Sequence, residues 1–336
     1  MEHLLLPTQA YVGIDVAKLT LDVMLLSGKS RSHATFDNTA TGFEKLLTWL
    51  RRHRVEDAHF CLEATGIYSY EIANFLYDQH KQVSVMNPRL IHDYRKGLNL
   101  RSKTDRLDAA LLAQYARERQ PQLWRPLPAT VQRLLQLVSH RETLLRIIGQ
   151  IKNRKETIRD LWIRKQEDAL LADLKEKEQA VVKELKTCIL ADEELKGIWK
   201  RLQTMVGVGP TSATYIVAYV GSIDRFENAS SLVNYAGLSV VEHSSGTSVQ
   251  DKPHIDRMGR GQLRKMLYMC ALVSKRWDPL MKQWAHTLSE KGKKKKVVIV
   301  AVMRKMLHII YGMWKHQRDY DPNLAFPHAA VVQAAA

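Results

Sequence analysis

Four carboxylates occur at spacings that suit a metal-dependent phosphoryl-transfer site: Asp15 in YVGIDVAK, Glu63 in HFCLEATG, and Asp105 and Asp108 in KTDRLDAALLA. Asp15 and Glu63 lie in or at the end of short apolar runs, which predict buried strands. Asp105 and Asp108 are three residues apart, so they share a face if the segment is a helix. A pair of Mg²⁺ ions would neutralise such acids and clamp the attacking and leaving oxygens of a phosphodiester. The four acids therefore predict a two-metal enzyme that acts on nucleic acid.

Each acid alone has an ordinary explanation. Asp15 suits a capping or edge position, Glu63 suits the charge at a helix N-terminus, and the pair at 105 and 108 suits ion pairs with Arg101 and Arg106. The metal-site hypothesis depends on the four occurring together, in the order first strand, fourth strand, later helix.

A second candidate site is the segment HSSGTSV, residues 243–249. It offers the hydroxyls of Ser244, Ser245, Thr247 and Ser248, with His243 adjacent and Arg257, Arg260 and Arg264 downstream. A serine nucleophile needs a base, a metal or cationic surroundings, and arginines suit the phosphate under attack. The same composition is common in structural turns, so chemistry alone leaves both explanations open.

The charge of the chain predicts a polyanionic partner. Lys and Arg number 51 and Asp and Glu 35, a formal net charge of +16, which favours DNA or RNA. Further candidate contacts are Lys265, Lys293, Lys294, Lys295, Lys296 and Arg304, interleaved with aromatic residues. Gly207 and Gly209 in MVGVGPTSA are typical of a helix-hairpin-helix element that binds phosphate, or of a simple corner between helices. The basic runs also suit an ordinary solvated surface.

The elements that must position these residues predict a multidomain α/β plus α protein. Residues 10–120 show three hairpin-type strands followed by alternating helices and strands, which predicts a ribonuclease H-like mixed sheet. In that fold the first strand lies beside the fourth, so Asp15 and Glu63 should meet. Prolines in 119–130 end this domain. Residues 128–200 predict a long helical coiled-coil segment suited to dimerisation, with its heptad interrupted at Arg141 and Glu142, or an ordinary bundle. Residues 201–320 predict a compact, mostly helical domain.

Cellular context follows from what the composition lacks. Three distant cysteines without ligand spacing argue against disulfides and structural zinc. We expect no membrane-spanning run and therefore a cytoplasmic protein, with a disordered alanine-rich end at 329–336.

The motifs YVGIDVAK, CLEATG, KTDRLDA, VGVGPTSA, YAGLS, SSGTSV, LRKMLYM and KKKKVVIVAVMRKML resemble the DEDD-type insertion-sequence transposases in order and spacing. The resemblance covers nearly the whole chain. It implies a RuvC-like domain carrying Asp15, Glu63, Asp105 and Asp108, a coiled-coil linker, and a C-terminal transposase domain whose nucleophilic serine directly precedes glycine. That position is Ser245. The preceding residue is Ser244, where relatives can carry an acid, so Ser244 stays an alternative.

The resemblance also implies a function. Members of the family are DNA recombinases guided by a bridge RNA that the mobile element encodes and that pairs with donor and target DNA. Ser245 would attack a DNA phosphate with the help of Mg²⁺, in a tetramer built of dimers whose active site is composite between protomers. Two alternatives remain: a metal-dependent nuclease like a Holliday-junction resolvase, with water as nucleophile, and a non-catalytic nucleic-acid-binding protein.

Overall fold

The computed structural model describes residues 10–326 except 101, 103, 242, 243, 246–248, 251–253 and 257. The chain forms two compact units, Met1–Pro126 and Leu127–Ala336. The boundary between them falls inside the proline-containing stretch that was predicted to end the first domain. The further division of the second unit near residue 200 stays a prediction.

The first unit is built on a mixed sheet of five strands in the order β3-β2-β1-β4-β5. The strands are β1 (Ala10–Val16), β2 (Thr20–Ser27), β3 (Ser30–Asp37), β4 (His59–Glu63) and β5 (Gln82–Met86). The first three pair antiparallel, whereas β1–β4 and β4–β5 pair parallel. The predicted adjacency of the first and fourth strands is therefore confirmed, and the topology is consistent with a ribonuclease H-like domain.

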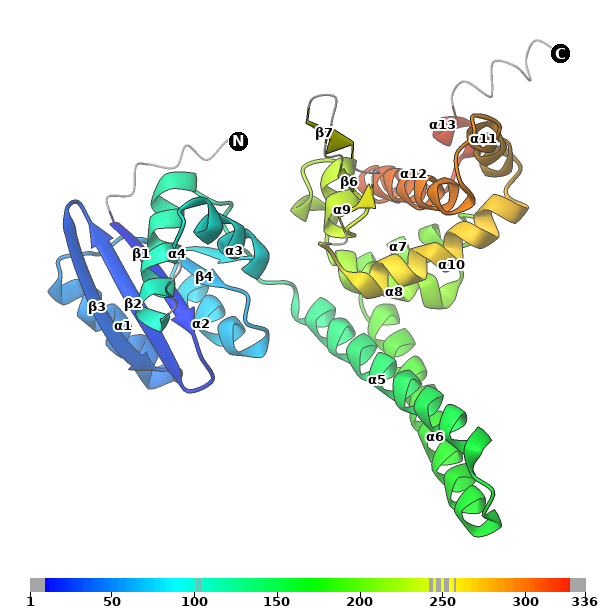
Figure 1. Cartoon of the computed structure of the whole chain (residues 1–336), viewed down its shortest axis with the longest axis horizontal. Coiled ribbons are helices and arrows are strands. Elements are labelled where there is room, and N and C mark those ends of the chain that lie inside the picture. The colour runs from blue at the N-terminus through cyan, green and yellow to red at the C-terminus, as the bar shows by residue number, and fades with distance from the viewer. Residues whose placement is uncertain are drawn as a thin grey trace. The chain divides into compact units, whose positions relative to one another are not determined.

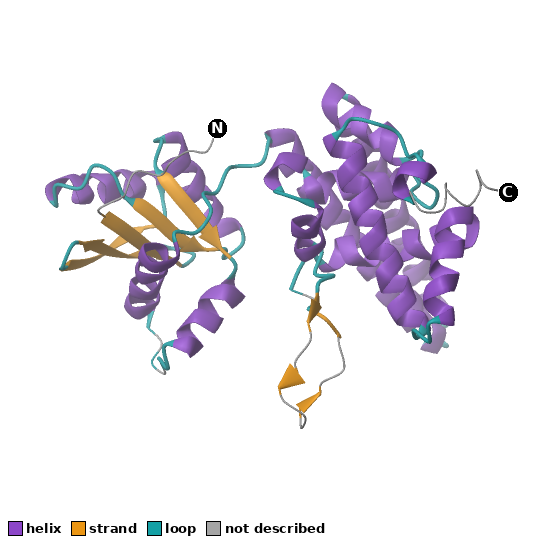
Figure 2. Cartoon of the chain, turned by 90° about the horizontal axis from the view of Figure 1, so that it is seen from above, coloured by secondary structure: helices purple, strands orange, loops and turns teal. Residues whose placement is uncertain are grey.

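Helices cover both faces of this sheet (Figure 2). They are α1 (Ala40–Arg52), α2 (Ile67–Asp78), α3 (Pro88–Gly97) and α4 (Asp105–Arg119). In β1, Val12 and Ile14 join the core formed with α1 and α2, while Tyr11 packs with residues of α4. Because successive strand residues face opposite sides, Gly13 and Asp15 lie on the α4 side.

Helix α4 approaches β1 more closely than a side chain would allow. A Cβ at Gly13 would lie 2.0 Å from the carbonyl oxygen of Ala109 and 2.4 Å from the amide nitrogen of Ala113. Both alanines are fully buried. The contact is thus backbone against backbone, and it fixes where the first turn of α4 lies relative to the end of β1.

The second unit begins with a helical hairpin, α5 (Ala129–Thr157) and α6 (Leu161–Leu190), whose helices lie side by side (Figure 1). Asp160 caps α6 by accepting a hydrogen bond from the amide of Ile163. The predicted long helical segment is confirmed as a hairpin within one chain, while a coiled coil between two chains stays a prediction.

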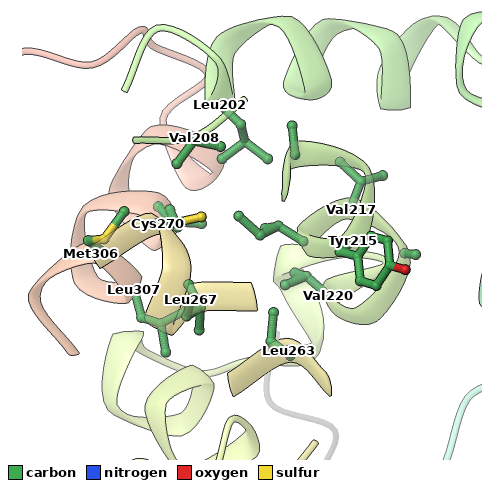
Figure 3. Close-up of a cluster of buried hydrophobic side chains, with 14 of the residues drawn as sticks. Leu202, Val208, Tyr215, Val217, Val220, Leu263, Leu267, Cys270, Met306 and Leu307 are labelled. Atoms are coloured by element: carbon green, nitrogen blue, oxygen red, sulfur yellow. The ribbon is translucent and has the colours of Figure 1, made fainter. Parts of the chain in front are cut away.

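The remaining elements of this unit are mostly helical. They are α7 (Glu193–Leu202), α8 (Pro210–Val220), the 3₁₀ turn η1 (Ile223–Arg225), α9 (Ala229–Tyr235), α10 (Gly261–Trp277), α11 (Pro279–Glu290), α12 (Lys295–Lys315) and α13 (Pro322–Ala325). Between α9 and α10 lie two short antiparallel ladders, β6 (Val240–Val241) with β9 (His254–Ile255), and β7 (Ser244–Ser245) with β8 (Val249–Gln250). Buried side chains from α7, α8, α10 and α12 meet in one core, among them Leu202, Tyr215, Leu267 and Met306 (Figure 3).

Helix α12 alone among the described helices has the length and composition of a membrane span, contrary to the expectation that no such run exists. Half of its apolar window is buried inside the protein, and it packs against α7, α9, α10 and α11. Its apolar character is that of a central core helix.

The heptad interruption at Arg141 and Glu142 marks where the hairpin docks against α8. Buried Tyr215 donates its hydroxyl proton to Glu142 at 2.7 Å, and Arg141 donates to that hydroxyl at 3.1 Å. Arg141 also binds Glu178 of α6 at 2.7 Å. The polar residues that break the apolar pattern therefore satisfy one another at a junction of three helices.

We predict that Gly13→Ala destabilises the first unit by at least about 2 kcal/mol, because the methyl group must displace backbone atoms of α4. The matched control is Gly97→Ala at the end of α3, where an added Cβ meets nothing within 4 Å. Thermal unfolding of both variants checks this. An unfolding midpoint for Gly13→Ala equal to that of Gly97→Ala would contradict the close contact.

Candidate active site

Two of the four predicted acids end neighbouring parallel strands. Ile14 of β1 pairs with Leu62 of β4, so the residues that follow, Asp15 and Glu63, lie next to each other at the same edge of the sheet. Both belong to the face that α4 covers, because Gly13 and Cys61, two residues earlier, contact α4 or its core. The strand pattern alone therefore brings the first pair of acids together.

The other two acids lie on the first turn of α4. Asp105 is its first residue and Asp108 follows in the same turn. Thr104 is the N-cap, and its hydroxyl oxygen accepts a hydrogen bond from the amide of Leu107 at 3.3 Å. The partial positive charge at a helix N-terminus favours carboxylates there, so this turn tolerates two of them.

The acids act on one another electrostatically at Asp15. Its pKa is raised from its usual 3.8 to about 6, first by burial and then by the negative charges of Asp108, Asp105, Glu63 and Asp22. The negative charge of each of the other three predicted acids contributes to this shift, because like charges disfavour ionisation of Asp15. All four predicted acids therefore share one electrostatic site.

Arg95 of α3 partly balances this charge and was not found by sequence reasoning. It forms an ion pair with Asp108, and both side chains are 15% exposed. A second nitrogen of Arg95 donates to the carbonyl oxygen of Ser102 at 2.9 Å. The ordinary explanation for Asp105 and Asp108 was ion pairs with Arg101 and Arg106; the structure pairs Asp108 with Arg95, and Arg101 lies outside the described residues.

Asp22 of β2 is a fifth acid beside the site that the sequence did not indicate. It is the cross-strand partner of Asp15. His33 lies 2.9 Å from its carboxylate, and the hydroxyl of Thr35 donates to the same oxygen at 3.2 Å. Since Asp22 has its own partners, it adds negative potential to the site while being held in place on β2.

The donor chemistry fits a hard divalent cation. Each predicted ligand offers carboxylate oxygens, the donors that Mg²⁺ prefers. Among the described residues, no three His, Cys, Asp or Glu side chains lie close enough together to hold a metal ion in this structure. The repulsion at Asp15 is what a cation would relieve, so the donor chemistry of these residues suits a divalent metal.

The serine segment, predicted as a loop, contains a short ladder. Ser244 and Ser245 form β7 and pair with Gln250 and Val249 of β8. The two strands are separated by three residues in the sequence, a spacing that also suits a hairpin. Three other predicted residues of this site, His243, Thr247 and Ser248, lie outside the described residues.

The predicted basic contacts fall into two groups in the second unit. Arg260 and Arg264 lie at the start of α10: Arg260 stacks on the Tyr235 ring, and Arg264 donates to the carbonyl oxygen of Ala236 at 2.9 Å. Lys265 is 3.4 Å from Glu142. The other group is exposed Lys293, Lys294, Lys295 and Lys296 before and at the start of α12, with half-buried Arg304 further along. Arg257 lies outside the described residues, and nucleic-acid contacts by all of these stay predictions.

The two predicted phosphate-binding glycines have different surroundings. Gly207 has a φ of +95°, and a Cβ there would lie 2.6 Å from the carbonyl oxygen of Cys270 in α10. Close packing explains this glycine without a phosphate. Gly209 caps α8 and has open space around it. The corner between α7 and α8 therefore accounts for Gly207, and a phosphate contact at Gly209 stays a prediction.

Comparison with known proteins gives one consistent result. A DEDD-type transposase family model matches residues 12–160, and a model described as "Transposase IS116/IS110/IS902 family" matches residues 199–286. The pilin gene-inverting proteins of Moraxella bovis and Moraxella lacunata are each 31% identical over 320 residues, covering 94% of this chain and 99% of theirs. A 43.6 kDa protein of insertion element IS110 from Streptomyces coelicolor is 27% identical over 123 residues, 37% of this chain and 30% of that protein.

We predict that Asp15→Asn stabilises the metal-free protein. The pKa of Asp15 is higher in the folded than in the unfolded state, so ionisation of Asp15 lowers the free energy of unfolding. This loss of stability is absent below about pH 4 and reaches its full size above about pH 6. In chelator at pH 7.5 the variant should gain on the order of 1–3 kcal/mol, and at pH 4 the gain should vanish. Thermal unfolding at the two pH values measures this.

The matched control for this experiment is Asp57→Asn, which removes the same charge from a carboxylate that is 95% exposed in the same unit. It should leave stability within about 0.5 kcal/mol at both pH values. Wild type more stable than Asp15→Asn in chelator at pH 7.5 would show that the acids do not repel.

Proposed function

Because the chain belongs to the IS116/IS110/IS902 family of transposases, enzymes that cleave and rejoin DNA, we propose that it is a site-specific recombinase that excises and inserts a mobile element. The observation that carries the proposal is the electrostatic coupling of Asp15 to Glu63, Asp105 and Asp108, in the part of the chain that matches the DEDD family model. The basic excess of the chain and its exposed lysines at 293–296 support nucleic acid as the partner.

Asp15, Glu63, Asp105 and Asp108 would hold a divalent cation, which we propose to be Mg²⁺, two ions per site. Bound Mg²⁺ supplies Lewis-acid stabilisation of charge on the reacting phosphate oxygens. The sheet edge fixes Asp15 and Glu63, the Gly13 contact fixes the first turn of α4, and Arg95 holds Asp108. These contacts hold the acids near one edge of the sheet and leave Asp15 facing the negative charge of its neighbours.

Ser245 is the proposed nucleophile. Its hydroxyl oxygen would attack a DNA phosphorus, form a phosphoserine bond and displace a 3′-oxygen, which leaves as a 3′-hydroxyl after taking up a proton. Reversal by a new 3′-hydroxyl would release the serine and rejoin DNA. A serine bound to the DNA preserves the energy of the broken phosphodiester, so rejoining needs no external energy source. The family resemblance and the position of Ser245 directly before Gly246 support this choice over Ser244.

Partners and location complete the proposal. By resemblance, an element-encoded bridge RNA pairs with donor and target DNA, so base pairing rather than the protein reads the sequence. The active form is proposed to be a tetramer built of dimers joined through the α5–α6 hairpin, acting in the cytoplasm. Exposed apolar residues at the tip of the hairpin, Leu161 and Trp162, suit contacts with another chain.

We predict that Ser245→Ala abolishes the covalent protein–DNA adduct and strand cleavage, because no other group replaces the attacking oxygen. The control is Ser244→Ala, which removes the neighbouring hydroxyl of the same strand and should retain both. A denaturing gel after reaction with labelled donor DNA measures the adduct. Adduct formation by Ser245→Ala, with its loss in Ser244→Ala, would move the role to Ser244.

Chelation and Asp15→Ala test the metal-dependent part of the proposal. We expect EDTA or Asp15→Ala to lower cleavage by at least about 100-fold, because charge on the reacting phosphate is no longer stabilised. Binding of DNA should persist in both cases, and Asp57→Ala should cleave normally. Cleavage without any protein-linked DNA would instead favour the resolvase-like alternative with water as nucleophile, and DNA binding without cleavage in any divalent metal would favour a non-catalytic protein.

Guidance by RNA is tested on the expressed protein beside its native flanking DNA. We expect a single element-derived RNA to co-purify with the chain and to be enriched over bulk cellular RNA on sequencing. Cleavage of donor DNA by protein freed of RNA, at the rate of the RNA-bound protein, would overturn RNA guidance while leaving the recombinase proposal intact.

A further inference from the structure

Two arginines lie over one tyrosine ring, that of Tyr235. The chain between Tyr235 and Arg260 carries the ladder of β7 and β8, which we call the serine hairpin. The guanidinium carbons of Arg225 in η1 and Arg260 before α10 each lie 5.6 Å from the centroid of the Tyr235 ring. Tyr235 ends α9, which leads directly to β6 and the strands that carry Ser244 and Ser245 (Figure 1). These short strands project from the helices of this unit (Figure 2).

The ring of Tyr235 is rigidly held. Its hydroxyl donates to the carbonyl oxygen of Tyr219 at 2.9 Å, and its ring packs edge-on against Phe226 at 5.3 Å. Phe226 is buried in the core. The stacking surface beneath both arginines is therefore part of the folded helical unit and does not depend on the hairpin.

Both guanidinium groups keep unused donors. Both side chains are exposed, and neither lies within 4.0 Å of a carboxylate in the described part of the chain. Arg225 donates one hydrogen bond to the carbonyl oxygen of Val220 at 2.9 Å, and Arg260 donates one to the hydroxyl of Tyr235 at 3.2 Å. A guanidinium group has five N–H donors, and stacking on a ring leaves those in its plane available to a phosphate.

The spacing of the two groups suits a nucleic-acid backbone. Since each guanidinium carbon is 5.6 Å from the same ring centroid, the two are at most twice that distance apart. A strand of DNA carries one phosphate per about 3.4 Å of helix axis, so two cations within this limit can reach neighbouring phosphates of one strand. Two cations held on one ring can therefore contact the same stretch of a strand.

The neighbouring cavity between α5, α8 and α10 is less suited to a phosphate. It has a volume of about 510 Å³, and its lining includes Lys265 and Glu142. Glu142 accepts a hydrogen bond from Tyr215 and pairs with Lys265 at 3.4 Å. A carboxylate that already balances the lysine disfavours another anion, whereas Arg225 and Arg260 have no carboxylate within 4.0 Å among the described residues.

We propose that Arg225, Tyr235 and Arg260 form a platform that binds phosphodiester groups of the strand next to the serine hairpin and so positions that strand. The proposal rests on the proposed function, in which this hairpin carries the nucleophile. Arg225 and Arg260 are binding residues here, and Tyr235 is a positioning residue that orients both.

The test uses the full chain and a fluorescent single strand of about 30 nucleotides, made as DNA and as RNA of the same sequence. Binding is followed by anisotropy between about 50 and 200 mM salt. We expect Arg225→Gln and Arg260→Gln each to reduce the slope of log affinity against log salt by about 0.7, the value for one phosphate contact on a single strand. Arg225→Lys keeps the charge and should retain the wild-type slope.

The matched control is Arg276→Gln. Arg276 is also exposed and stacked on an aromatic ring, with its guanidinium carbon 5.0 Å from the centroid of Trp277, but it lies at the opposite end of α10 from Arg260. Its loss removes the same charge and should leave the slope unchanged. Equal slopes for Arg225→Gln and Arg276→Gln on both probes would overturn the platform, as would a loss in Arg225→Lys equal to that in Arg225→Gln.

The two probes separate the sources of phosphate. A slope reduced with the DNA probe assigns the platform to a DNA strand, and a slope reduced with the RNA probe alone assigns it to the guide RNA. Because binding is measured without cleavage, the outcome is independent of the Ser245 adduct. An adduct that persists in Ser245→Ala would refute the proposed chemistry while leaving a measured loss of slope as evidence for the platform.

Discussion

The backbone contact between Gly13 and α4 is the constraint on which the acidic site depends. Asp15 lies two residues after Gly13 on the same face of β1. Asp105 and Asp108 lie in the first turn of α4, the helix whose backbone packs against Gly13. A larger residue at 13 would move α4 outward and take its first turn away from the sheet edge. The position of Glu63 does not depend on the Gly13 contact, since parallel pairing of β4 with β1 already places it beside Asp15.

The carboxylates at the ends of β1 and β4 lie in a region of negative potential. Asp15 carries the raised pKa, Asp22 adds negative potential from β2, and in the described part of the chain Arg95 pairs with Asp108. The helix N-terminus of α4 supplies a further partial positive charge, which falls off within one turn. A site built only for stability would replace Asp15, whose ionisation is disfavoured by burial and by its acidic neighbours. The persistence of these acids beside a buried sheet is the physical reason to expect a divalent cation rather than a set of ion pairs.

Much of this arrangement could be predicted from the sequence because it depends on local periodicity. The apolar runs before Asp15 and Glu63 indicated strands, the three-residue spacing of Asp105 and Asp108 indicated one helical face, and the glycine-poor stretch from Val131 indicated long helices. Contacts between segments that are distant in the sequence leave no periodic pattern from which they could be predicted. Arg95 is 13 residues from Asp108, and nothing in the sequence favours it over Arg101 or Arg106. The close approach at Gly13 and the ladder at Ser244 and Ser245 likewise depend on tertiary contacts or on turn geometry.

The second unit illustrates how a break in a pattern can be informative. Arg141 and Glu142 interrupted the heptad of the long helix and argued against a strict coiled coil, and both turn out to bind Tyr215 where α8 meets the hairpin. Arg225 and Arg260 are informative for a similar reason, because they differ from other arginines of this unit in their partners. A chain that pairs Arg141, Arg133 and Arg154 with glutamates leaves these two arginines stacked on Tyr235 with no carboxylate partner in the described residues. Contact with the ring lowers the entropy lost on binding, because each guanidinium group is already restrained before the phosphate arrives. Arginines held on an aromatic ring are therefore better suited to positioning a strand than the exposed lysines at 293–296, whose charge acts mainly through long-range attraction.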